Sequence, residues 1–100
     1  QGIAAQYSEA VLDLAEKANE ADKVLAEIKL VNEVIGSDRD MTVVLNHPSI
    51  SSEEKKKFLS SLFSGKLSEL TGTLLNLLAD KRRLDILPFI ESSYRGLLNK

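Results

Sequence analysis

The chain has 100 residues and a mass of 11.0 kDa, which is the size of one small domain. It contains no cysteine, so disulfide bonds, thiolate metal ligands and a cysteine nucleophile are excluded. Thirteen Lys and Arg against fifteen Asp and Glu give a net charge of −2, which favours neither nucleic acid nor an anionic membrane surface as a partner. Leucine contributes 17 residues, and valine and isoleucine together only 12, which favours helices over strands.

Apolar residues recur at helical spacing in two segments near the start of the chain, residues 3–18 and 22–35. The apolar stripe of the first segment is rich in alanine. Small residues on a helix face either let another helix approach closely or leave a shallow groove. Gly36 follows the second segment, and there we expect it to end the helix in the left-handed conformation.

Polar residues mark the starts of the next two predicted helices. Residues 37–40 resemble a cap for a short third helix, which carries Met41, Val44 and Leu45. Pro48 ends that helix, because a residue before proline is disfavoured in helical conformation. Ser51 and Glu54 have the spacing of a capping box for a fourth helix, and Gly65 follows its end. The predicted buried residues of the fourth helix are Phe58, Leu59, Leu62 and Phe63.

The fifth predicted helix is unusually apolar and has Ser68 as its candidate N-cap. Its leucines cover more than one face: Leu67, Leu70, Leu74, Leu75, Leu77 and Leu78. Such a helix contacts several neighbours, or a partner besides its own fold. A sixth helix begins after Asp85, with Pro88 in its first turn. Six helices joined by short turns predict one compact all-α bundle over residues 1–100.

The sequence contains no pattern typical of an active site, a metal centre or a cofactor site. His47 is the only imidazole and lies beside Pro48, where a surface or turn-structuring role is expected. Asp38 and Asp40 lack the further ligands of a calcium loop. The three lysines at residues 55–57 follow two glutamates, which predicts a solvated basic face on the fourth helix. The basic residues 81–83 suit the negative C-terminal end of the fifth helix. No apolar run is long enough to span a membrane.

Two interpretations of the apolar excess remain at this point. The alanine-rich first helix and the leucine-rich fifth helix either build only the core, or they leave a groove for an amphipathic helix of a partner. With a net charge of −2, we expect such contact to be hydrophobic and only weakly sensitive to salt.

The order of residues in three stretches resembles the N-terminal domain of the delta subunit of F-type ATP synthases, the counterpart of the mitochondrial oligomycin-sensitivity-conferring protein. Residues 5–15 are similar to the opening helix of that family, with its Tyr and the Ala three residues on. Residues 45–51, followed by Glu54-Lys55 and Phe58-Leu59, are similar to its leucine–proline–isoleucine segment and lysine-bearing helix. Residues 74–84, with Leu87, Pro88 and Ile90, resemble its fifth helix and the Arg-Leu that ends it.

This resemblance implies a six-helix bundle and a non-catalytic stator role without a cofactor. In the family, the domain lies on top of the catalytic head and binds N-terminal helices of the alpha subunits between its first and fifth helices. The positions that carry over are Tyr7, Ala10, Val11 and Leu14 on one wall, and Leu74, Leu77 and Leu78 on the other. Which of these face outward is left open by the resemblance.

The resemblance also implies a setting. The chain is expected to be a fragment that lacks the C-terminal domain through which the subunit meets the b-type subunits of the peripheral stalk. The subunit would be peripheral, without membrane insertion, on the ATP-synthesising side of an energy-transducing membrane such as the bacterial cytoplasmic or thylakoid membrane. The alternative is a generic helical regulatory or scaffold domain that binds an amphipathic helix of an unrelated partner. A small hydrolase would need a catalytic constellation that the sequence lacks.

Overall fold

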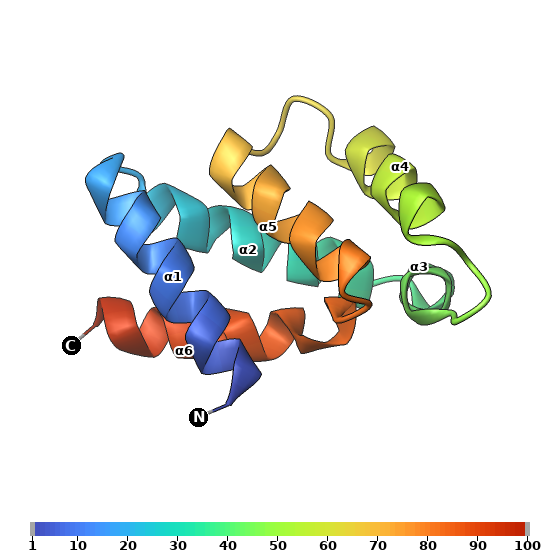
Figure 1. Cartoon of the computed structure of the whole chain (residues 1–100). Helices are drawn as coiled ribbons and strands as arrows, with labels where there is room; N and C mark the ends of the chain where they lie inside the picture. Colours follow the sequence, from blue (N-terminus) through green and yellow to red (C-terminus); the bar gives the residue numbers. More distant parts are fainter. Residues whose placement is uncertain (1, 100) are drawn as a thin grey trace.

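The helices predicted from apolar spacing are present in the computed structural model, which describes residues 2–99 (Figure 1). They are α1 (Ile3–Lys17), α2 (Ala21–Gly36), α3 (Arg39–Asn46), α4 (Ser52–Leu62), α5 (Glu69–Asp80) and α6 (Leu87–Leu98), with a short 3-10 helix, η1 (Leu84–Ile86), directly before α6. No strand occurs within residues 2–99. The all-α class and the six-helix bundle are therefore confirmed.

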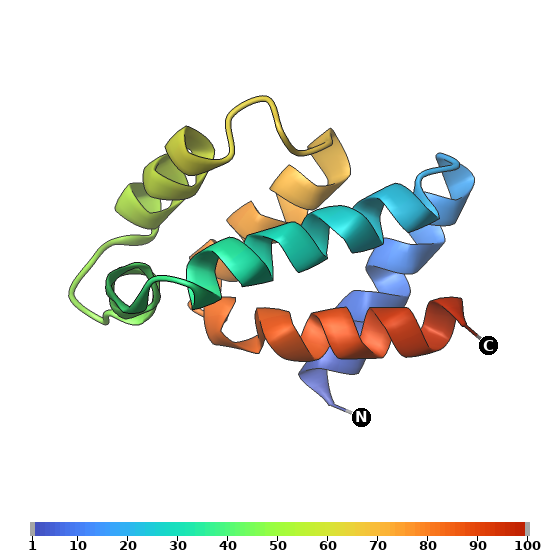
Figure 2. The same cartoon turned by 180° about the vertical axis from the view of Figure 1, so that it is seen from behind.

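The bundle has two layers. α1 and α5 lie on the face seen in Figure 1, whereas α2 and α6 lie in front when the molecule is turned round in Figure 2. α1 packs across α6 and also contacts α2 and α5, while α3 and α4 pack at the far end against α2 and α5. The side chains buried between the layers include Val24, Ile28, Val31, Leu78, Ile90 and Tyr94.

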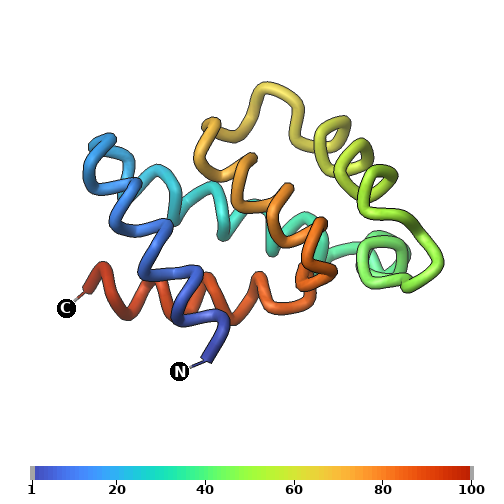
Figure 3. The backbone as a smooth tube through the Cα atoms, viewed as in Figure 1, coloured from blue at the N-terminus to red at the C-terminus, as the bar shows by residue number. Residues whose placement is uncertain are grey.

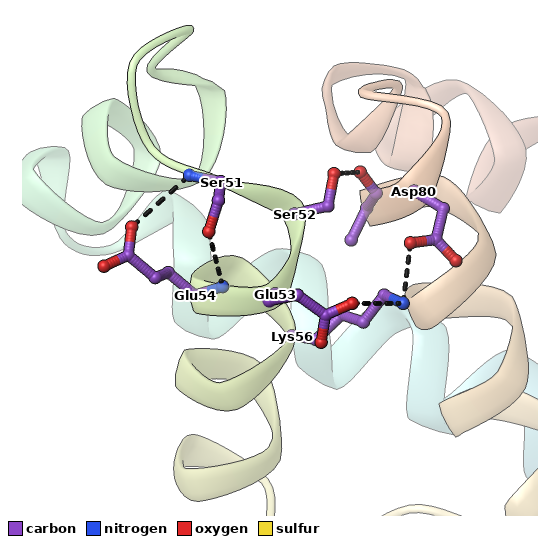
Figure 4. A network of polar contacts seen from close by, with 7 residues as sticks. Ser51, Ser52, Glu53, Glu54, Lys56 and Asp80 are labelled. Atoms are coloured by element: carbon purple, nitrogen blue, oxygen red, sulfur yellow. Dashed lines mark hydrogen bonds and ion pairs between the residues drawn. The ribbon is translucent and has the colours of Figure 1, made fainter.

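Polar contacts fix where α3 and α4 begin. Asp38 accepts a hydrogen bond from the backbone N–H of Asp40 at 2.9 Å, which is the predicted cap of α3. At the start of α4, Ser51 and Glu54 form the predicted capping box (Figure 4). Figure 4 also shows how α4 is tied to the end of α5, because Lys56 pairs with Asp80 at 2.6 Å.

The start of α5 is held by another helix rather than by its own cap. Ser68 occupies the N-cap position, but its side chain accepts no capping hydrogen bond from a backbone N–H of α5. Instead Glu27 of α2 accepts hydrogen bonds from the Ser68 N–H at 3.0 Å, from the Ser68 hydroxyl at 2.8 Å and from the Thr71 hydroxyl. A carboxylate at a helix N-terminus also interacts favourably with the helix dipole. The Glu27 carboxylate, buried between α2 and α5, is therefore the cap of α5.

Two polar groups anchor α6 to the other layer and to α2. The buried Ser8 hydroxyl of α1 lies 3.1 Å from the carbonyl oxygen of Ile90, where a larger residue would keep the two helices apart. The Tyr94 hydroxyl donates to the carbonyl oxygen of Ala21 at 2.7 Å. Burial is the main reason that the pKa of Tyr94 is raised to about 12, and the charges of Asp22 and Glu16 add to it.

α2 ends at Gly36 as predicted, but the left-handed conformation predicted for Gly36 is wrong. Gly36 is the last residue of α2, and the following residue, Ser37, stays in right-handed helical conformation with φ −79 and ψ −11. The Ser37 hydroxyl donates to the carbonyl oxygen of Val34 at 2.8 Å, so a side chain satisfies the helix end. The left-handed conformation occurs instead at Gly65, with φ 73, after the end of α4.

We expect Glu27→Ala to lower the free energy of unfolding by about 2–3 kcal/mol, because it removes three hydrogen bonds to a charged acceptor. For a domain of this size, that loss lowers the melting temperature by about 10–20 °C. Thermal and urea melts followed by circular dichroism measure both quantities. Glu33→Ala, at an exposed position on the same helix, is the matched control. Equal stabilities of the two variants would show that Glu27 does not hold α5.

The raised pKa of Tyr94 predicts that the folded chain becomes less stable at alkaline pH. The pKa is about 12 in the folded chain against an ordinary value of 10.0 for tyrosine, so between these values the unfolded chain loses a proton that the folded chain keeps. The free energy of unfolding should therefore fall as the pH rises from 10 to 12. Urea melts at several alkaline pH values measure this fall, and it should be smaller in Tyr94→Phe. An equal fall in both proteins would contradict the assignment.

Candidate functional site

The exposed side of α1 carries an apolar stripe. Tyr7, Ala10 and Leu14 are spaced by three and four positions, so they lie on one face of the helix. Tyr7 is half-buried and Ala10 is exposed, while Leu14 is 52% exposed despite being a large apolar residue. The buried side of α1 lies next to this stripe and contains Ser8, Val11 and Ala15.

α5 has a corresponding stripe on its exposed side, and Leu70 and Thr73 of this stripe line a hollow together with Leu14 of α1. Leu70 is half-buried, Thr73 is exposed and Leu77 is 39% exposed. Leu74 lies between these positions on the helix and is buried. α1 and α5 are in contact, and the tube in Figure 3 shows them running side by side in opposite directions. The two stripes thus form the walls of a shallow surface, which we call the α1/α5 groove: Tyr7, Ala10, Leu14, Leu70, Thr73 and Leu77.

The groove opens into a hollow of about 410 Å³ where α1 ends and α5 begins. Leu14 and Leu70 form its apolar part, and Ala18 and Thr73 border it. Glu20 and Glu69 place two carboxylate side chains beside it. Polar and apolar lining together are typical of a surface that recognises an amphipathic helix.

Burial divides the predicted site residues into two groups. Ala10, Leu14 and Leu77 are exposed and Tyr7 is half-buried, so these four are accessible on the groove. The other three, Val11, Leu74 and Leu78, belong to the core. All seven residues that the resemblance implies lie on α1 and α5, but the buried three back the groove from the core rather than add to its exposed surface.

Several groove residues are absent from the predicted set. Leu70 lies seven residues before Leu77, so the same helical spacing indicates it. Thr73, Ala18 and Glu69 line the hollow only because of the way α1 and α5 pack. No pattern within either helix marks them.

A second apolar patch lies where the start of α1 meets α6. Phe89 is 65% exposed, and with Ile3, Ala4, Ala5 and two serines it lines another hollow. This patch has one large aromatic side chain and no second leucine-bearing helix as a wall, so the α1/α5 groove is the better candidate for docking a helix.

The residues considered as catalytic or metal-binding candidates, His47 and Asp38, have structural roles in a turn and at a helix start. His47 is exposed, and its Nδ1 accepts a hydrogen bond from the backbone N–H of Ser49 at 3.1 Å, which confirms the turn-structuring role. Asp38 acts as a helix cap. Within residues 2–99, no group of three or more His, Cys, Asp or Glu side chains is placed to hold a metal ion.

The two basic clusters are only partly solvated. Lys57 is exposed as predicted, but the prediction was wrong for Lys55, which is 3% exposed. A lysine can bury its aliphatic stem in this way. Burial, and then the Arg82 guanidinium, lowers the pKa of Lys55. A hydrogen bond to Asp80 raises the pKa of Lys56. α5 ends at Asp80 as its basic cluster begins, in agreement with the predicted helix end.

Comparisons with known proteins give one consistent result. The model of the ATP synthase delta (OSCP) subunit family matches residues 3–100. Among curated proteins, the ATP synthase delta subunit of Clostridioides difficile is 36% identical over 98% of this chain, and that of Chlorobium chlorochromatii is 34% identical over 95%. The chloroplastic delta subunit of Gracilaria tenuistipitata var. liui is 31% identical over 96% of this chain. These matches cover 55%, 53% and 52% of the relatives, so the chain spans about half their length.

A solved structure has the same fold. A chain in a cryo-EM structure of the Polytomella F-ATP synthase head and rotor superposes with a TM-score of 0.89 at 26% identity. The match covers 98% of this chain and 87% of the other.

Because Leu77 is partly exposed and Leu78 is buried, replacing each with alanine should lower the free energy of unfolding by different amounts. Leu78 is fully buried, so Leu78→Ala should destabilise the chain by about 2–5 kcal/mol, through lost burial and the cavity left behind. Leu77→Ala should cost less than about 1 kcal/mol, because 39% of Leu77 is already exposed to solvent. Urea melts of the two variants measure the difference. If the neighbouring substitutions destabilise equally, the outward orientation of Leu77 is wrong.

Proposed function

This chain belongs to the ATP synthase delta (OSCP) subunit family, and from that premise we propose that it is a stator domain that binds N-terminal helices of the alpha subunits. In this role it lies on top of the catalytic head and performs no chemistry itself. Its task is mechanical, because a head that turned with the rotor would lose the torque needed for ATP synthesis.

The observation that supports this proposal is the exposure of leucine on two adjacent helices. Leu14 and Leu77 remain 52% and 39% exposed, although α5 buries Leu74, Leu75 and Leu78 completely or nearly so. An amphipathic helix laid between α1 and α5 would remove both side chains from water. Because only about half of each side chain is still exposed, burying the exposed part contributes roughly 0.6–1.5 kcal/mol per leucine.

The remaining partners follow from the same premise. The domain holds the head, and another part of the same subunit joins it to the b-type subunits of the peripheral stalk. Within residues 2–99, no helix is long and apolar enough to cross a membrane. We place the subunit at the periphery of the complex, on the ATP-synthesising side of the membrane.

The direct test is calorimetric titration of this chain with a synthetic peptide of about the first 20 residues of an alpha subunit from the same complex. Binding with a negative heat-capacity change is expected, because apolar surface is buried. Leu77→Asp should weaken binding by at least about tenfold, since it replaces an apolar contact with a charge. No binding to the folded wild-type chain would contradict the proposal.

Two further variants locate the contact. Val43→Asp is the matched control, because Val43 is 54% exposed on α3 and lies outside the groove. It should leave the affinity unchanged. Phe89→Asp tests the competing patch at the start of α1. If this variant abolishes binding and Leu77→Asp does not, the peptide docks at the Phe89 patch instead.

A further inference from the structure

The α1/α5 groove carries opposite charges at its two ends. At the end that holds the hollow, Glu20 and Glu69 lie beside the apolar lining. At the other end, Lys81 follows Leu77 by four residues, so it continues the α5 stripe by one turn. No ion pair within residues 2–99 involves any of these three side chains.

The backbone adds to the negative charge of the hollow. α1 ends there, and the C-terminal end of a helix carries partial negative charge. α5 begins there, and its positive N-terminal end would oppose this effect if it were open. However, the buried Glu27 carboxylate already occupies that end through Ser68 and Thr71. Lys17, in the last turn of α1, is paired with Asp13 at 3.2 Å. The carboxylates of Glu20 and Glu69 therefore give the hollow its negative charge.

Lys81 is a cation at the opposite end, and no other side chain among residues 2–99 forms an ion pair with it. Of its neighbours, Arg82 donates to the carbonyl oxygen of Pro48 at 3.1 Å, and Arg83 lies 3.8 Å from a carboxylate oxygen of Asp85. Lys81 itself is exposed. At this end the negative C-terminal end of α5 and the positive N-terminal end of α1 oppose each other, so the Lys81 ammonium group sets the sign of the charge. The groove thus runs from a negative end at the start of α5 to a positive end at its finish.

We propose that a helix docked in the α1/α5 groove lies in one direction, with its amino end at Glu20 and Glu69 and its carboxyl end at Lys81. The docked helix is then parallel to α5 and antiparallel to α1. Its positive N-terminal end and any amino group or basic side chain of its first turn meet the carboxylates, while its negative C-terminal end meets the ammonium group. The partner is accordingly an amphipathic helix with a basic or amino-terminal start. This inference rests on the proposed function.

The expected preference is modest, because the charged residues are largely exposed. Each favourable charge at a helix end changes an equilibrium by a small factor at low salt, and two ends together favour one direction by about 3- to 30-fold. Apolar burial supplies the affinity, and the charges select the direction.

Paramagnetic labelling of the docked helix tests the direction. The chain has no cysteine, so a nitroxide can be attached through a single cysteine on the alpha-subunit peptide alone. A label at the first residue of the peptide should broaden the amide signals of Ala18 and Glu69. A label at about the twelfth residue, which is roughly 17 Å along the helix from the first, should broaden those of Tyr7 and Lys81. The reverse pattern, or equal broadening from both labels, overturns the direction.

A charge reversal tests the cause. Glu69→Lys should weaken peptide binding by about 2- to 5-fold at low ionic strength, and the loss should shrink in 0.5 M salt. Glu9→Lys is the matched control, because Glu9 is exposed on α1 outside the groove. Equal affinities of the two variants overturn the electrostatic basis, and melting curves confirm that both are folded.

The two proposals fail in different ways. If neither labelled peptide shifts any amide signal, the groove does not bind this helix, and the proposed function fails together with the direction. If the peptide binds and Leu77→Asp weakens it, but the labels show no preferred direction, the proposed function stands and only the inference about direction fails.

Discussion

The arrangement of the groove depends on a buried carboxylate that joins two helices. Glu27 projects from α2 and accepts hydrogen bonds from Ser68 and Thr71 at the start of α5, so the position of α5 is set by α2 rather than by its own cap. α5 needs this external fixation because it serves two surfaces. One side of it supplies Leu74, Leu75 and Leu78 to the core, and the adjacent side presents Leu70 and Leu77 to the groove. A helix free to rotate about its axis would exchange the two sets, so the Glu27 contact maintains both the core and the exposed stripe.

α1, the opposite wall, is fixed by close packing. Ser8 is buried where α1 meets α6, and its small side chain allows the helices to approach while its hydroxyl bonds to the α6 backbone. On the next face of the same helix, Ala10 and Leu14 remain accessible. The exposed apolar surface is therefore carried by two helices whose other faces are already packed. Such a surface is preorganised, so docking a helix needs little ordering of the domain, and less of the binding free energy is lost.

Local patterns predicted the parts of the fold that depend on neighbours in the sequence. The capping box of Ser51 and Glu54 needs only three residues of separation, and it forms as expected. Ser68 shows where this reasoning stops, because its partner, Glu27, is 41 residues away and cannot be found from spacing. The same limit applies to the site. Val11 and Leu14, or Leu74 and Leu77, are neighbours on one apolar arc, and only the position of adjacent helices decides which member is buried. Lys55 was misjudged for the same reason, since its burial depends on the residues packed around α4.

The net charge of the chain does not reveal how its charged residues are distributed along the groove. A net charge of −2 indicates a nearly neutral chain and predicts contacts that depend mainly on apolar burial. Yet the charges that border the groove are sorted along it, with Glu20 and Glu69 at one end and Lys81 at the other. Opposite charges at two ends cancel in the net charge, but a helix lying between them interacts with both, because its own ends have opposite partial charges. Near neutrality is thus compatible with a directional surface. In the proposed role, which is to hold a larger assembly in a fixed orientation, direction matters as much as affinity.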